Sequence, residues 1–129
     1  MTIRQALTGT DGSVAIEYGL LLPALLLMLF LIIDTGRLLW TQTTLDRAVE
    51  AAARCGAIDA TDCGSTAQIQ SYAAAQAYGM TVDASAFTAV VTSCGVQVNA
   101  SFAFSPSIPL LGSGTIALTA SACYPKSAT

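Results

Sequence analysis

Apolar residues fill one stretch near the start of the chain almost without interruption. Between Val14 and Ile33 there are 20 residues and a single charge, on Glu17. As an α-helix this segment spans about 30 Å, the hydrocarbon thickness of a bilayer. A carboxylate inside such a segment costs about 2.5–3.5 kcal/mol on insertion scales, so we expect Glu17 to have a function. The pattern predicts a membrane-inserted helix with a functional acid near one end.

After Asp34 the chain keeps a helical period but becomes amphipathic. Apolar positions recur at helical spacing, with charged positions on the other faces: Leu38, Leu45, Ala48, Val49 and Ala52 against Arg37, Asp46, Arg47, Glu50 and Arg54. We therefore predict one long helix over residues 13–57, transmembrane in its first half and packed on a small domain in its second. Gly56 is expected to end this helix, and Pro23 to bend or loosen it.

A second, shorter helix is predicted over residues 67–78. Ser65 followed three positions later by Gln68 fits a capping box at its start. Gly79 fits the left-handed residue that follows a helix end. A loop holding Cys63 connects the two helices.

The rest of the chain alternates with period two, which predicts three strands with one apolar face each. The apolar positions are Phe87, Ala89 and Val91; Val96, Val98, Ala100, Phe102 and Phe104; and Ile116, Leu118, Ala120 and Ala122. The strands join at residues 93–95 and through a Pro/Gly/Ser-rich connection, residues 105–114. The predicted fold is α+β, with a small antiparallel sheet covered by the amphipathic half of the long helix.

Composition narrows the function classes. The 129 residues are 53% hydrophobic and 10% charged, with a net charge of −3, which argues against nucleic acid as a partner. The chain has no histidine, so it lacks the commonest general base and the commonest metal ligand. We expect neither an enzyme nor a bound metal or cofactor.

The four cysteines, Cys55, Cys63, Cys94 and Cys123, all follow the apolar segment, which favours disulfides in an oxidising compartment. A zinc site would typically include a CxxC pair, and a catalytic thiol would need an activating base such as histidine. This chain has neither. Of three connectivities, Cys55–Cys63 with Cys94–Cys123 is favoured, since the first closes a short loop after the long helix. In a flat meander the first and third strands lie about 9–10 Å apart, beyond the usual Cα limit near 7 Å. Either the sheet curls there or the third strand pairs beside the first.

The polar residues 1–12 allow two interpretations. Asp11 could be the N-cap of the long helix, or the segment could be a leader removed after Gly12. A secretory signal fits less well, because its apolar core usually has about 7–15 residues and residues 34–37 form no small-residue cleavage site. We expect the apolar helix to be retained.

Gly12, Ser13, Glu17 and Tyr18 resemble the processing site of type IV pilin-like proteins: a glycine, a neutral residue, an acid five positions after the glycine, an aromatic residue and a long apolar run. Three further motifs sharpen this: Leu-Leu-Leu-Pro at 20–23, Ile-Ile-Asp-Thr-Gly-Arg at 32–37 and Leu-Asp-Arg-Ala-Val-Glu-Ala-Ala-Ala-Arg at 45–54. The ordered set resembles the TadE-like family, pseudopilins (minor pilins) of the tight-adherence, or Flp, pilus. A weaker similarity lies at 120–125.

The resemblance implies a processing pathway. A prepilin peptidase of the bacterial inner membrane would cut between Gly12 and Ser13, separating a leader (1–12) from the long helix (13–57) and an extracytoplasmic domain (58–129). An inner-membrane assembly platform would then extract the single-pass subunit from the lipid into a pilus at the cell surface, among other pilin and pseudopilin subunits. A mature length of 117 residues (129 minus 12) points to a minor subunit in pilus biogenesis and adhesion.

The resemblance also gives Glu17 a role. Cleavage would free an α-amino group at Ser13, which is largely charged at neutral pH because its reference pKa is about 7.7–8. Pairing that amine with Glu17 of a neighbouring subunit would remove the cost of two charges in an apolar setting. Alternatively, Glu17 reaches the headgroup region unpaired, and Tyr18 is an interfacial aromatic rather than an assembly residue.

Two other functions compete with the pilin. One is a signal-anchored extracytoplasmic binding module that never polymerises. The other is a membrane-tethered thiol oxidoreductase, which the absence of histidine and of a CxxC motif argues against.

Overall fold

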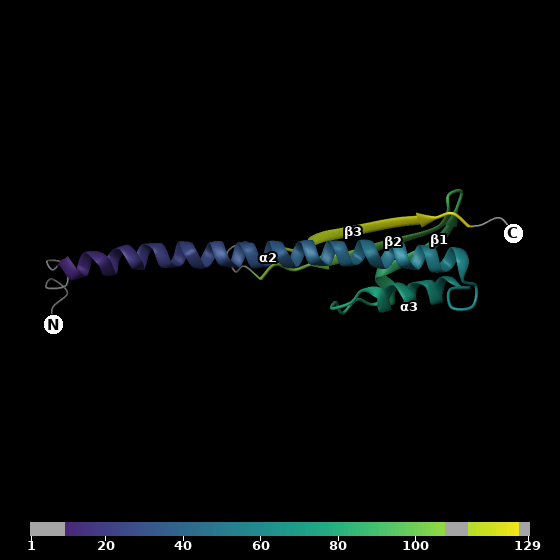
Figure 1. The fold of residues 1–129 in the computed structure, drawn as a ribbon, viewed down its shortest axis with the longest axis horizontal. Coiled ribbons are helices and arrows are strands. Elements are labelled where there is room, and N and C mark those ends of the chain that lie inside the picture. Colours follow the sequence, from purple (N-terminus) through teal and green to yellow (C-terminus); the bar gives the residue numbers. More distant parts are fainter. Residues whose placement is uncertain (1–9, 108–113, 127–129) are drawn as a thin grey trace.

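The computed structural model describes residues 10–107 and 114–126, with side chains from Val14 onward. It contains helix α2 (Thr10–Ile58), helix α3 (Thr66–Gln76), a short 3-10 helix η1 (Ala84–Ala86) and strands β1 (Phe87–Thr92), β2 (Gly95–Phe104) and β3 (Ile116–Tyr124). Figure 1 shows the N-terminal half of α2 projecting alone, with the other elements gathered along its second half. The predicted α+β fold, with a long apolar helix, a second helix and a three-stranded antiparallel sheet, is confirmed.

α2 is longer than expected at both ends. It begins at Thr10, so Asp11 lies inside the helix rather than at its N-cap, and it continues unbroken through Pro23. Gly56 does not end it, because the helix runs on to Ile58. A Cβ at Gly56 would lie 2.7 Å from Ile69 Cδ1. The glycine therefore lets α3 approach α2 closely, which is why a helix-stop interpretation was wrong.

The predicted capping box at the start of α3 is confirmed. Gln68 N–H donates to Ser65 Oγ at 3.3 Å, while Ser65 N–H donates to Gln68 Oε1 at 3.0 Å. The helix ends at Gln76, two residues earlier than expected. Gly79 does have a left-handed backbone, with φ of +78°, but it lies in the turn beyond the helix end.

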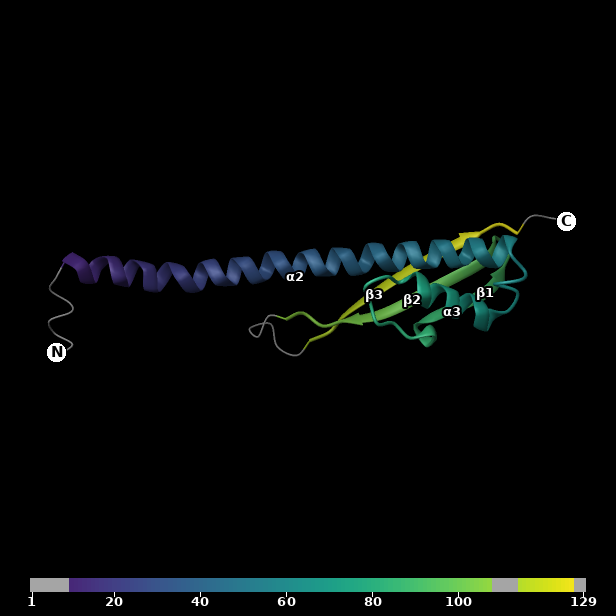
Figure 2. The same ribbon diagram turned by 60° about the horizontal axis from the view of Figure 1, so that its bottom comes forward.

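The sheet has the order β1-β2-β3, with both pairs antiparallel. α2 packs mainly against β3 and β2, and α3 against β1, so the two helices cover one face of the sheet; Figure 2 shows this two-layer arrangement. Val91 and Ile116, predicted on the apolar face, are 75% and 44% exposed, because each lies at or beside a strand end. The largest fully buried side chains described are Phe87, Leu45, Val49, Val98 and, in the turn between α2 and α3, Cys63.

Candidate functional site

The half of α2 that precedes the domain is apolar on all sides, and the described residues leave it exposed. Every residue from Val14 to Ile33 is exposed, and the first buried side chain described along the helix is that of Asp34. Leaving a large aliphatic side chain in water rather than burying it costs about 1.5–3 kcal/mol. Among the described residues, one helix is long and apolar enough to cross a membrane, and it is this one. A single N-terminal apolar helix of this kind fits a membrane anchor with a domain outside.

The four predicted processing and assembly residues lie within about two turns at the start of α2. The Gly12–Ser13 peptide bond falls in the first turns of the helix, while the side chains at these positions lie outside the described set. Glu17 and Tyr18 are exposed, Tyr18 by 68%. In the part of the chain that the structure describes, the one ion pair joins Asp34 to Arg37. Glu17 therefore has no cationic partner among these residues.

A polar contact closes the fold where α2 leaves its apolar half. Asp34 is 8% exposed, and its Oδ2 accepts a hydrogen bond from the backbone N–H of Ser107 at 2.9 Å. Its Oδ1 lies 3.4 Å from Arg37 Nη1. Arg37 also donates to Ser107 Oγ and lies over the ring of Phe104, 5.7 Å from the centroid. We call these four residues the Asp34 latch.

The Asp34 latch fixes the end of β2 and the start of the β2–β3 connection to α2, across 73 positions of sequence between Asp34 and Ser107. The sequence prediction missed it. The one available signal was that Asp34 is the first charged residue after a long apolar run, where an unpaired carboxylate would be costly. The partner itself, a backbone N–H far along the chain, carries no mark in the sequence.

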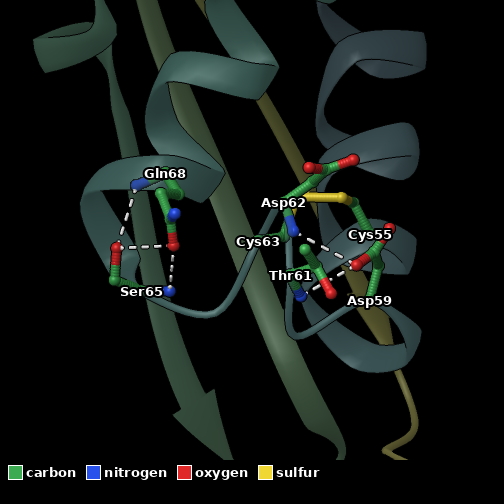
Figure 3. The surroundings of a disulfide bond; sticks show 7 residues. All are labelled: Cys55, Asp59, Thr61, Asp62, Cys63, Ser65 and Gln68. Atoms are coloured by element: carbon green, nitrogen blue, oxygen red, sulfur yellow. Dashed lines mark hydrogen bonds between the residues drawn. A yellow bond between two sulfur atoms is a disulfide. The ribbon is translucent and has the colours of Figure 1, made fainter.

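The first disulfide joins Cys55 and Cys63, with a Cα–Cα distance of 5.7 Å, and closes the turn between α2 and α3. Figure 3 shows how the turn is built: the carboxylate of Asp59 accepts the backbone N–H groups of Thr61 and Asp62 at 2.9 and 3.1 Å. The capping box at Ser65 then starts α3. The bridge and these hydrogen bonds together fix the reversal that lays α3 beside α2.

The second disulfide joins Cys94 and Cys123, with a Cα–Cα distance of 6.4 Å, and confirms the favoured pairing. Strand β3 pairs with β2, so the alternative in which it pairs beside β1 is wrong. Cys94 lies in the two-residue turn between β1 and β2. Cys123 lies on β3, opposite Gln97 of β2. The bridge can form because Cys94 lies in the turn and not within β1, so its distance to Cys123 is not fixed by the separation of the first and third strands.

The cysteines and acids of the described residues form no free thiol and no metal site. All four cysteines are in disulfides, so none is a free thiol. Across the described residues, no three His, Cys, Asp or Glu side chains lie close enough together to hold a metal ion.

The comparisons with known proteins give one match. Residues 12–54 match the family model described as TadE-like protein. This stretch holds the Gly12 and Glu17 motif, the apolar run and the amphipathic half of α2, so the resemblance read from the sequence is confirmed there. The family suggests a protein associated with the Tad pilus. No curated protein and no solved structure matches the chain.

Proposed function

We propose that this chain is a minor pilin of a tight-adherence type IV pilus, with a structural rather than an enzymatic role. The observation that carries this is the apolar half of α2, exposed on all sides from Val14 to Ile33, with Glu17 near its start. The TadE-like match over residues 12–54 supports the same function. A helix of this kind needs lipid or other helices around it, and a pilus subunit meets both in turn.

The proposed sequence of events begins in the bacterial inner membrane. A prepilin peptidase cuts between Gly12 and Ser13, and the retained helix holds the domain outside the cytoplasm. The two disulfides support this side of the membrane, because such bonds persist in oxidising compartments. The assembly platform then moves the subunit from lipid into a pilus, where its helix packs against those of other pilin and pseudopilin subunits and contributes to adhesion.

Glu17 is the proposed assembly residue. In the apolar core of a pilus its carboxylate accepts the charged α-amino group of Ser13 from a neighbouring subunit, which sets the axial register between the two helices. Removing one partner of such a buried pair costs about 3–5 kcal/mol, because the other charge is left uncompensated. In the membrane the same carboxylate lies near the headgroup layer, where an unpaired charge costs less.

The test compares Glu17→Ala with Glu50→Ala in cells lacking the native copy. Glu50 is an exposed carboxylate on the outer half of the same helix, so its loss controls for the removal of one charge. We expect Glu17→Ala to insert and to be cleaved normally, yet to lose crosslinking to other pilus subunits and surface piliation. Glu50→Ala should keep both. Normal crosslinking and normal pili with Glu17→Ala would refute the assembly role and favour a signal-anchored module that does not polymerise.

A further inference from the structure

Two aromatic side chains lie exposed together on the domain, close to the apolar half of α2. Trp40, the one tryptophan of the chain, is 63% exposed, and Tyr78 is 70% exposed. Both line the same hollow of about 430 Å³ between α2 and the end of α3. A Cβ placed on Gly79 would lie 3.8 Å from Trp40 Nε1, so the turn after α3 lies directly beside the indole. Neither ring belongs to the core.

The height of Trp40 along α2 fits the lipid headgroup layer. It follows Ile33, the last residue of the apolar run, by seven positions, which is about 10 Å of helix. The headgroup layer extends about 5–7 Å beyond the hydrocarbon on each side of a bilayer. Helical side chains point toward the N-terminus of their helix, so the indole ring extends back from the backbone of Trp40 and reaches this layer.

A second aromatic residue lies near the opposite end of the apolar run. Tyr18 and Trp40 are 22 positions apart, which corresponds to about 33 Å along one helix, against about 30 Å for the hydrocarbon core. Tryptophan and tyrosine favour both interfaces because each has an apolar ring with a polar hydrogen-bonding group. The two rings therefore lie toward opposite ends of the apolar run, with Tyr18 about 6 Å inside the edge that Val14 marks.

Tyr78, which follows α3, lies at about the same height along α2 as Trp40. α3 runs back beside α2 (Figures 1 and 2). The chain after it carries Tyr78, which lines the same hollow as Trp40. The acid nearest this boundary, Asp34, is buried and hydrogen-bonded to Ser107 rather than presented to the lipid. The surface around the two rings therefore does not expose that carboxylate at the headgroups.

We propose that Trp40 and Tyr78 form an aromatic anchor that seats the outer domain on the outer headgroup layer of the membrane. This rests on the proposed membrane insertion and goes beyond it, because it assigns the domain a lipid-binding surface and a fixed height. The anchor holds the subunit with its domain against the bilayer before assembly. Extraction into a pilus must release both rings from the lipid.

The single tryptophan allows a direct test with the full chain in phosphatidylcholine vesicles. Bromine atoms on the acyl chains quench nearby indoles, and they can be placed either close to the headgroup or close to the chain terminus. We expect Trp40 to lose more fluorescence with the shallow bromine than with the deep one. The variant carrying Trp40→Phe with Tyr78→Trp should give the same shallow pattern, which a tryptophan far from lipid would not.

Two matched variants calibrate the depth scale, each in the Trp40→Phe background. Leu25→Trp lies about 22 Å deeper along α2, near the middle of the apolar run, and should be quenched most by the deep bromine, whereas Ile58→Trp lies about 27 Å farther out and should respond to neither. If Trp40 and Tyr78→Trp behave like Ile58→Trp while Leu25→Trp is quenched, the aromatic anchor is refuted and the membrane helix stands. If Leu25→Trp is not quenched by either lipid, the membrane insertion itself fails, and the anchor with it.

Discussion

Replacing Asp34 with alanine should detach the β2–β3 connection from α2. The carboxylate accepts the N–H of Ser107 at 2.9 Å and lies 3.4 Å from Arg37 Nη1. A hydrogen bond to a charged group contributes about 1.5–3 kcal/mol. The ion pair adds only about 0–1 kcal/mol, because the side chain of Arg37 is 53% exposed and solvent screens it. Asp34→Ala should therefore lower the free energy needed to open the β2–β3 connection from α2 by about 2–3 kcal/mol.

Amide hydrogen exchange at Ser107 measures this change at the bond that is lost. A cost of about 2–3 kcal/mol corresponds to exchange that is faster by roughly 30- to 150-fold, since about 1.36 kcal/mol is a factor of ten. Arg37→Ala is the matched control, because it keeps the Asp34–Ser107 hydrogen bond and should have a smaller effect. Asp34→Asn should fall between the native chain and Asp34→Ala. An increase below about fivefold in Asp34→Ala would show that the carboxylate does not hold this segment.

Three further changes test the outer domain. Gly95→Ala should lower its melting temperature strongly, because Gly95 has φ of +127° and a Cβ there would overlap the Tyr124 carbonyl oxygen. Gly114→Ala should not, because no atom of the described residues lies within 4 Å of the added Cβ, and equal shifts would contradict this. Ser65→Ala should cost about 1 kcal/mol of stability in denaturant unfolding, since it removes the helix cap, and an unchanged midpoint would count against that cap. Reducing both disulfides should make the domain, but not the inserted helix, sensitive to protease, because each bridge typically contributes about 2–4 kcal/mol; unchanged resistance would show that they are dispensable.

Local patterns in the sequence predicted most of the elements. The 20 apolar residues and the amphipathic repeat after Asp34 predicted one long helix, and alternation predicted three strands, because each pattern reflects the neighbours that a repeating backbone brings to one face. The capping box at Ser65 was also predictable, since both partners lie within one turn. The motif of Gly12 and Glu17, together with the motifs at 20–23, 32–37 and 45–54, predicted the family match over residues 12–54.

Features that depend on distant contacts were not predictable in the same way. Gly56 was predicted to end the helix because glycine is common after helix ends. In the structure it lies within the helix, and its lack of a side chain leaves space for Ile69 of α3. The Asp34 latch pairs a side chain with a backbone N–H 73 positions away. The turn position of Cys94 was predicted at residues 93–95, but the flat strand spacing of about 9–10 Å did not show that a cysteine in that turn comes within 6.4 Å (Cα–Cα) of Cys123.

The mass of the intact protein extracted from bacterial membranes tests the proposed pilin function most directly. Processing by a prepilin peptidase predicts a chain that begins at Ser13 and has lost residues 1–12. Replacing Gly12 with leucine should leave the full-length mass, because the peptidase must bring this carbonyl close to its catalytic acids and a bulky side chain blocks that approach. A native chain that keeps residues 1–12 in cells making the peptidase, or a Gly12→Leu chain cut like the native one, would contradict the pilin function.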